Sequence, residues 1–238
     1  MHSKYSYYKF VSDLVTREEF DKLVNKLDIE FGNLLSREIL EYILIDEMGR
    51  NKKFIVPISE IKPNQSCTIF GKVMEKLVRE KHLSLIISDN TLSCFLNLWG
   101  RNADIGESVE IGDVLKIVNG YSRLGREGLE VNVGKWGYVE ANPKDAPSIE
   151  IRPVHGTLVE KEDTEVKFDD NGDVRFFKRI WLKENGTIFH VNVWDNHVKL
   201  VNKLREGDFI KIENPVRRVI NGRAEIEVRA ASKIITKS

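Results

Sequence analysis

Two short segments of this sequence combine a large aromatic side chain with a hydrogen-bonding amide: Asn97-Leu98-Trp99 and Asn192-Val193-Trp194. In an extended chain, alternate side chains point to the same side, so each tryptophan shares a face with its asparagine. Such a face, if exposed, suits the stacking and hydrogen bonding of bases in a groove for single-stranded nucleic acid. The alternative is that the tryptophans close a barrel end or a domain interface, because tryptophan is often mostly buried.

The same alternation places further side chains beside the two tryptophans. Apolar residues occupy every second position of both segments, which marks the side that faces the core. The outward positions of these segments, and of the run that precedes the second one, are candidate nucleic-acid-binding residues: Phe95, Asn97 and Trp99, then Arg179, Trp181, His190, Asn192 and Trp194.

Each tryptophan is followed by a basic hairpin. An arginine in such a hairpin can pair with a phosphate or stack on a base, whereas the alternative is an ordinary solvated hairpin. The candidate residues are Tyr121, Arg123 and Arg126 in the first hairpin, and Arg217, Arg218 and Arg223 in the second. Further candidates are Lys76 and Arg79 in a basic loop, Arg101 directly after the first tryptophan segment, and Trp136.

Other kinds of chemistry find no support. The five histidines are scattered, and none lies near a cysteine or another histidine at the spacing of a metal site. The segment from Gly125 to Gly128 does not lead from a strand into a helix, so it is no nucleotide-binding loop. The acidic run 169–173 lacks the downstream glutamate of a calcium loop. We therefore expect no catalytic residues, no metal, no cofactor and no enzyme activity.

Composition narrows the class of protein. Basic and acidic side chains both number 37, so a protein that coats nucleic acid by bulk positive charge is excluded, whereas a local basic groove is not. Hydrophobic residues make up 41% and charged residues 31%, which is typical of a soluble globular chain. There is no apolar run long enough for a transmembrane helix, and no secretory signal is predicted. Two cysteines without a CxxC pair indicate a reduced, intracellular protein.

The two tryptophan segments belong to an internal repeat with an offset of 95 residues. The matched positions are Asn97 and Asn192, Trp99 and Trp194, Gly112 and Gly207, and Lys116 and Lys211. Only the first run differs, since Gly71 and Gly156 are 85 residues apart. The second copy therefore contains an insertion, placed within Lys161–Arg175, which we expect to be a hydrophilic loop or hairpin tip.

Each copy consists of five short β-rich runs, with a helical or irregular segment between the third and the fourth. The runs are Cys67–Val73, Leu83–Ser88, Leu92–Trp99, Val114–Val118 and Leu129–Val133, then Val154–Val159, Phe176–Leu182, Thr187–Trp194, Phe209–Ile212 and Ala224–Val228. This order predicts two tandem five-stranded Greek-key barrels of the OB type. SH3-like barrels are the alternative, but they are usually shorter and lack the long element between strands three and four.

The first fifty residues have a different, helical pattern. Thr16 and Glu19 have the spacing of a capping box, and Ser36 can cap a second helix. We predict a mainly β protein with a small α-helical N-terminal module, with domains at 1–50, 54–140 and 150–236. The module carries seven basic and ten acidic side chains, a net charge of −3, which favours contact with proteins over contact with DNA.

The sequence resembles the archaeal single-stranded DNA-binding proteins of the replication protein A type. The resemblance lies in Phe31–Ser36 with the helix after it, Ile58–Pro63 leading into Phe70–Val73, Leu96–Gly100, Val118–Tyr121 and Val133–Gly137. It implies that Trp99 stacks on a DNA base, that Trp194 does so in the second barrel, and that Tyr121 or Trp136 supplies a second aromatic contact.

The resemblance implies a non-enzymatic protein that coats and protects single-stranded DNA in replication, repair and recombination, with little sequence preference. It further implies a prokaryotic, nucleoid-associated location, replication or recombination partners bound through residues 1–50, self-association on DNA and no contact with membranes. Two alternatives remain open: an RNA- or tRNA-binding OB protein of translation, and an OB scaffold that docks proteins.

Overall fold

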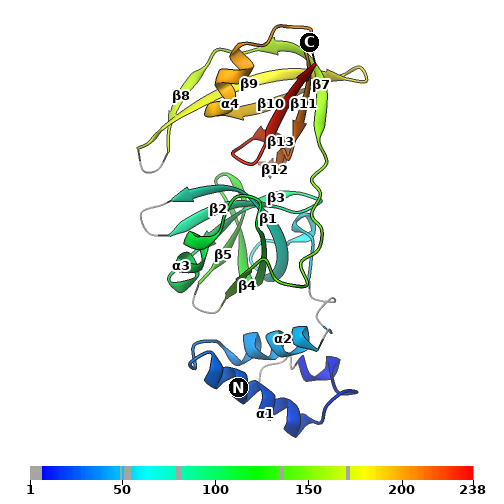
Figure 1. Cartoon of the computed structure of the whole chain (residues 1–238), viewed down its shortest axis with the longest axis vertical. Coiled ribbons are helices and arrows are strands. Elements are labelled where there is room, and N and C mark those ends of the chain that lie inside the picture. The colour runs from blue at the N-terminus through cyan, green and yellow to red at the C-terminus, as the bar shows by residue number, and fades with distance from the viewer. Residues whose placement is uncertain are drawn as a thin grey trace.

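A computed structural model describes residues 7–48, 50, 55–78, 82–134, 137–169 and 172–237 of the chain. The chain forms three tiers: a helical module, a first barrel and a second barrel, stacked along the long axis (Figure 1). The fold is mainly β with a small helical part, as the sequence predicts. Among the described residues, no helix is long and apolar enough to cross a membrane.

The helical module begins with a short 3-10 helix, η1 (Tyr7–Phe10), followed by α1 (Arg17–Glu30) and α2 (Arg37–Glu47). The predicted capping box is present, because the Thr16 hydroxyl accepts from the Glu19 amide and the Glu19 carboxylate accepts from the Thr16 amide. Ser36 caps α2 as expected. A second 3-10 turn, η3 (Ile58–Glu60), leads into the first barrel.

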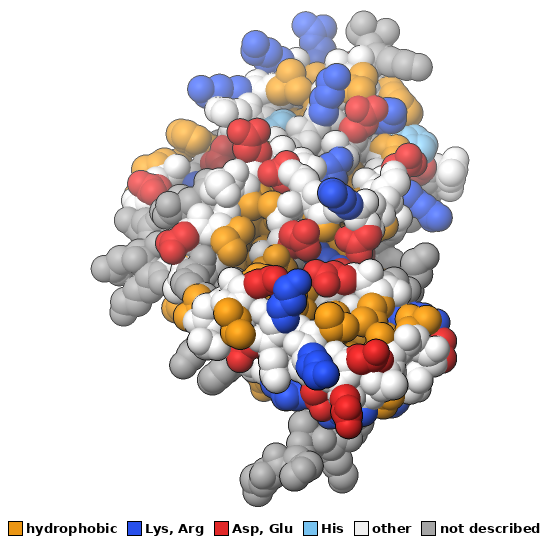
Figure 2. Space-filling model, turned by 60° about the horizontal axis from the view of Figure 1, so that its bottom comes forward, with side chains coloured by type: hydrophobic (Ala, Val, Ile, Leu, Met, Phe, Trp, Pro, Cys, Tyr) orange, Lys and Arg blue, Asp and Glu red, His pale blue; other side chains and the backbone are white. Residues whose placement is uncertain are grey.

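The module packs on the outside of the first barrel. Its core, which includes Phe20 and Ile39, also takes in Val118 of the barrel, with Tyr138 packed against it. The buried ammonium group of Lys116 forms ion pairs with Asp46 of α2 and with Asp145. Figure 2 shows acidic and basic side chains interspersed on the face that carries the module. The described residues of the module therefore present no continuous basic surface on that face.

The first barrel contains six strands and one helix. They are β1 (Ser66–Val78), β2 (Leu83–Ser88), β3 (Ser93–Leu98), α3 (Arg101–Ser108), β4 (Val114–Gly125), β5 (Gly128–Val133) and β6 (Tyr138–Ala141). The strand order is β1-β2-β3-β5-β4-β6, and a further pairing of β1 with β4 closes the barrel. The helix between the third and fourth strands and the parallel pairing of β3 with β5 give the predicted five-stranded OB-type barrel.

The second barrel repeats this plan. Its elements are β7 (Val154–Lys161), β8 (Glu165–Phe168), β9 (Val174–Glu184), β10 (Thr187–Trp194), α4 (Asn196–Asn202), β11 (Phe209–Glu213), β12 (Val216–Ile220), β13 (Arg223–Val228) and β14 (Lys233–Lys237). The insertion forms a hairpin in which β8 pairs with β9. The fourth strand is one piece in the first barrel but is divided into β11 and β12 here, because Pro215 lacks the amide hydrogen that a continuous ladder needs.

Candidate nucleic-acid interface

The predicted alternation holds in the third strand of both barrels. Leu96 and Leu98 of β3, and Val191 and Val193 of β10, are fully buried in the two barrel cores. The residues between them lie on the opposite side of the strand. Asn97 and Asn192 therefore occupy equivalent outward positions. Each lies two residues before its tryptophan, on the same side of the strand.

Trp99 directly follows the last residue of β3 and is 37% exposed. Its ring stacks on that of His82, with 4.3 Å between the ring centres and an angle of 22° between the planes. The indole Nε1 donates a hydrogen bond of 3.4 Å to Asn132 on β5. The ring is thus held in place, with part of its surface open for a further stacking partner.

Trp194 is more enclosed than Trp99. Its ring meets Phe177 edge-on at 4.9 Å, and the guanidinium of Arg229 lies 4.3 Å from the ring centre. Its indole Nε1 is buried without a hydrogen-bond partner among the described residues. The ring therefore combines one packed side with an unsatisfied donor, which is a site that a polar ligand atom can complete.

A polar pair beside each tryptophan is repeated with the same offset. In the first barrel, the Asn97 amide lies 3.4 Å from the Glu130 carboxylate on β5. In the second barrel, Asn192 donates to Glu225 on β13 at 3.0 Å. Because a carboxylate repels phosphate and accepts from base edges, these pairs favour a path in which bases face the sheet and phosphates lie outside.

The two Asn–Glu pairs and Trp194 line two adjoining hollows that run from one barrel to the other. The hollow on the first barrel measures 230 Å³ and is bordered by His82, Ser84, Phe95, Asn97, Arg123, Arg126, Glu127 and Glu130. The hollow between the barrels measures 490 Å³ and shares Phe95, Arg126 and Glu127 with the first. From the second barrel it takes Lys167, Phe168, Phe177, Arg179, Asn192, Trp194, Glu225 and other residues. We call the two hollows together the inter-barrel cleft.

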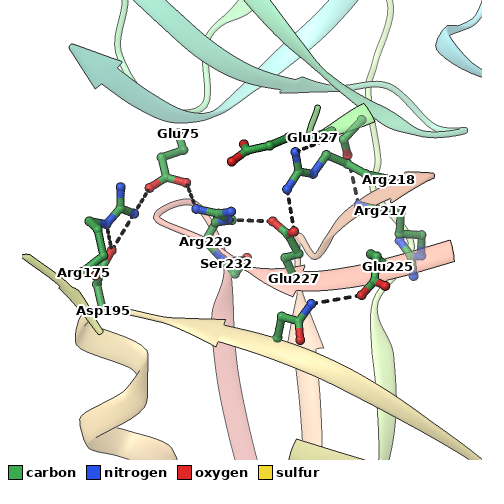
Figure 3. Close-up of polar contacts among 12 residues, drawn as sticks. Glu75, Glu127, Arg175, Asp195, Arg217, Arg218, Glu225, Glu227, Arg229 and Ser232 are labelled. Carbon is green, nitrogen blue, oxygen red and sulfur yellow. Dashed lines mark hydrogen bonds and ion pairs between the residues drawn. The ribbon is translucent and has the colours of Figure 1, made fainter. Parts of the chain in front are cut away.

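The inter-barrel cleft has a chain of buried ion pairs along its floor (Figure 3). Glu75 of the first barrel contacts Arg175 at 2.7 Å and Arg229 at 3.2 Å, both in the second barrel. Glu227 pairs with Arg229 at 2.7 Å and with Arg218 at 2.6 Å. Positive and negative side chains therefore alternate along this series of ion pairs, which joins the two barrels.

The pKa values of Glu227 and Arg175 follow from their places in this series of ion pairs. Burial alone raises the pKa of Glu227, but Arg229 and Arg218 outweigh burial and hold the pKa below its ordinary value. Burial alone lowers the pKa of Arg175, yet its pairs with Asp195 and Glu75 raise it above the ordinary value. Glu227 and Arg175 therefore stay charged at neutral pH.

Backbone features allow this close contact. A bulge between Val73 and Glu75 in the pairing of β1 with β2 interrupts the alternation at Glu75, which points toward the second barrel. At Gly128, in the β4–β5 turn, an added Cβ would lie 2.8 Å from the Val219 carbonyl oxygen. Glycine at this position therefore lets the two backbones approach.

Eight of the predicted site residues line the cleft: Phe95, Asn97, Arg123, Arg126, Arg179, Asn192, Trp194 and Arg218. Trp99 lies beside them through its stack on His82. The others lie off the cleft: Lys76, Tyr121, Trp181, His190, Arg217 and Arg223. Arg79 and Trp136 lie outside the described residues, and of Arg101 only the backbone, at the start of α3, is described.

Four side chains expected to be exposed are buried: Phe95, Asn97, Asn192 and Arg218. Phe95 points away from the first core, as predicted, but only 6% of it is exposed, because it packs with Met74, Ile86 and Val216 between the barrels. Arg218 is also buried, with its guanidinium 4.7 Å from the Phe95 ring and paired with Glu227. Phe95 and Arg218 are thus covered at the contact between the barrels, so neither is a free contact in this conformation.

Sequence reasoning missed several cleft residues. His82 and Phe177, which contact the two tryptophans, are 95 residues apart, and so are Glu130 and Glu225. The repeat offset could therefore have found all four. The cluster of Glu75, Arg175 and Arg229 carries no such signal, because the pairs that Glu75 makes join the two barrels. Among the described residues, no group of three metal-ligating side chains could hold a metal ion.

Comparison with known proteins gives one sequence match across most of the chain. Replication factor A of Methanothermobacter thermautotrophicus is 25% identical over 86% of this chain, which spans 31% of that relative's length. The resemblance to archaeal replication protein A is confirmed. The chain covers less than a third of this relative, so the activity of the longer protein is not carried over here. No protein-family model matches the chain.

Two solved structures illustrate the similarity of fold. The second OB-fold domain of replication protein A from Methanococcus maripaludis is 29% identical, with a TM-score of 0.32, over 39% of this chain and 99% of that chain. Fission yeast Pot1, solved with single-stranded DNA, is 11% identical, with a TM-score of 0.37, over 75% of this chain and 85% of that one. The fold assignment itself rests on the strand order described above.

Proposed function

We propose that this chain binds single-stranded DNA along the inter-barrel cleft, without catalysing a reaction on it. The observation that carries the proposal is the repetition of one arrangement in both barrels, a tryptophan beside an Asn–Glu pair, with a cleft that runs between the copies. Stacking at about 1–3 kcal/mol per base supplies much of the affinity and is tolerant of sequence. The chain coats and protects single strands during replication, repair and recombination.

The charges of the cleft fit this role. Among the described residues, six cationic and four acidic side chains border the hollow between the barrels. Several cations are already paired with carboxylates, so only some can meet phosphates. The affinity consequently depends on salt, but with a shallow slope: about 4–6 phosphate contacts, each changing log K by roughly −0.7 per log unit of salt.

The cellular setting follows from the same role. The chain acts on the DNA of a prokaryotic cell, and the helical module, which lies at the far end of the first barrel from the cleft, binds replication or recombination proteins (Figure 1). Its net charge of −3 suits a protein partner better than DNA.

A competition titration tests the proposal. Oligo-dT and an RNA of equal length are titrated at two salt concentrations, with the intrinsic tryptophan fluorescence as the signal. We expect quenching by both oligonucleotides, tighter binding of the DNA and the shallow salt slope above. Tighter binding of RNA would favour the translation-type RNA-binding protein. Absence of binding to either would favour the protein-docking scaffold, and an affinity independent of salt would contradict the phosphate contacts.

A further inference from the structure

The junction between the two barrels is built from an acceptor face and a donor hairpin. The acceptor face belongs to the first barrel and consists of Glu75 at the bulge of β1, with Ile86 and Phe95 beside it. The donor is the β12–β13 hairpin of the second barrel. Its Val216 packs on Ile86 and Phe95, and Arg218 lies over the Phe95 ring.

The acceptor face recurs on the second barrel. A bulge between Leu158 and Glu160 in the pairing of β7 with β9 matches the bulge at Glu75, 85 residues earlier. Glu160 pairs in register with Trp181, and Trp181 with His190, as Glu75 pairs with Ile86 and Ile86 with Phe95. The backbone construction is therefore the same in both barrels.

This second acceptor face is open in the described structure. Glu160 is exposed, and Trp181 and His190 are partly exposed, their rings 5.4 Å apart. The His190 Nε2 atom is already bound to Glu225 at 2.8 Å, so only the ring faces of the pair are offered to a ligand. At the edge of the face, Ile188 is 56% exposed. None of these residues borders the inter-barrel cleft. A carboxylate beside an aromatic pair suits a ligand with an apolar or aromatic side chain and a guanidinium.

The donor hairpin also recurs, on the first barrel. Tyr121 and Arg123 of β4 precede Val216 and Arg218 by 95 residues, so both hairpins have the pattern of an apolar residue, one residue, then arginine. Tyr121 is 48% exposed. Arg123 pairs with Glu130 of its own barrel at 2.7 Å, whereas Arg218 pairs with Glu227, two residues beyond the position that matches Glu130.

We propose that the Glu160–Trp181–His190 face of one chain binds the β4–β5 hairpin of a second copy, so that chains join head to tail. Tyr121 of the second copy packs on the aromatic pair, and its arginines meet Glu160. Such a contact is heterologous and repeats the apolar part of the junction within each chain, in which Val216 packs on Ile86 and Phe95. In that junction Glu75 is paired with Arg175 and Arg229, which lie outside the hairpin. A heterologous contact generates an open row rather than a closed dimer. In such a row the clefts follow one another. Because neighbouring copies on a long single strand then contact each other, the strand is bound cooperatively.

Site-directed cross-linking tests the contact directly. Two full-length proteins of different size tags are prepared, one with Glu160→Cys and the other with Tyr121→Cys, and are joined by a short bis-maleimide. Because burial raises the pKa of Cys67 to about 12 and that of Cys94 above its ordinary value, the native thiols do not compete. We expect a mixed product of the two tagged proteins, enriched by long oligo-dT. A mixed product no more abundant than with a Glu206→Cys partner would overturn the proposal.

A charge reversal measures the consequence for binding. Glu160→Arg is compared with Glu206→Arg, an exposed change elsewhere on the same barrel, on oligo-dT of ~20 and ~60 nucleotides, lengths chosen from the site size of OB folds. We expect both variants to bind the short strand like the parent chain. On the long strand, Glu160→Arg should lose about tenfold in cooperativity, equivalent to about 1.4 kcal/mol per contact.

The outcomes separate this proposal from the proposed function. If no variant and no parent chain binds either strand, the DNA-binding function fails, and cross-linking without DNA still decides the contact. If Glu160→Arg changes the affinity for the short strand as much as for the long one, the face contacts DNA itself and the head-to-tail contact is wrong. Unchanged cooperativity on the long strand would also refute it.

Discussion

The guanidinium of Arg229 lies 4.3 Å from the centre of the Trp194 ring and also pairs with Glu75 of the other barrel. The tryptophan of the second barrel is thereby tied to the ion pairs that hold the barrels together. In the described structure Trp99 stacks on His82 within its own barrel and does not contact these ion pairs. Equivalent positions of the repeat therefore have different surroundings.

Trp99→Ala should weaken DNA binding without unfolding the protein. The ring is 37% exposed and rests on His82, so its removal leaves no core cavity. We expect a loss of about 1–3 kcal/mol in the affinity for oligo-dT, measured by fluorescence anisotropy with a labelled strand, and an almost unchanged Tm. A Tm that falls in proportion to the affinity would show that Trp99 has a structural role only.

Trp194→Ala should reduce both affinity and stability. We expect an effect on binding at least as large as that of Trp99→Ala. The packing of the ring against Phe177 and Arg229 adds a folding cost, toward the about 3–5 kcal/mol of a buried tryptophan. Trp194→Phe is the control, because it keeps an aromatic face but removes the unpaired indole donor. Calorimetry and oligo-dT titration of both variants decide the matter, and an unchanged Tm for Trp194→Ala would contradict the role of the packing.

Glu75→Gln should uncouple the two barrels. It removes one carboxylate from the buried chain and leaves Arg175 and Arg229 short of a partner, and breaking a buried pair costs about 3–5 kcal/mol. Glu160→Gln, at the equivalent exposed bulge of the second barrel, is the matched control and should leave the unfolding free energy unchanged. Chemical denaturation measures both variants. Equal stabilities would show that the chain of ion pairs does not hold the junction.

Acid should weaken the junction between the barrels. The pKa of Glu227 is lower in the folded chain than in the unfolded chain because of Arg229 and Arg218, despite its burial. Its contribution to stability is therefore complete above the unfolded pKa of about 4.3 and is lost as the pH falls through the lower folded value. The Tm measured from pH 6 to pH 3 should fall below about pH 4.3, and less so in Glu227→Gln. An identical acid profile in the two proteins would be evidence against this linkage.

Asp46→Asn should destabilise the module without reducing DNA affinity. Asp46 on α2 and Asp145 are the two carboxylates paired with the buried Lys116, so the change leaves Lys116 with one of them. We expect a loss of about 1.5–3 kcal/mol, typical of a hydrogen bond to a charged group, and an affinity for oligo-dT close to that of the parent chain. Asp13→Asn, an exposed carboxylate of the module, is the control. A large loss of affinity would show that the module shapes the path of the DNA.

The sequence by itself determined the helical caps, the two barrels and the faces of their third strands. Thr16 and Glu19 interact within one turn of helix, and Leu96 and Leu98 follow a period of two, so both signals are local. Because the repeat has an offset of 95 residues, a feature recognised in one barrel predicts its counterpart in the other. These signals suffice because the hydrophobic period fixes which side of an element faces its own core.

Only the tertiary structure decided which outward-facing side chains remain accessible. Alternation places Phe95 outside its barrel, but it does not show that Val216 of the other barrel covers it. The pair of Glu75 and Arg229 joins residues 154 positions apart, in different barrels. No local pattern encodes such a contact, because it depends on how two separately folded surfaces meet, and the ion pairs form only once both barrels are complete.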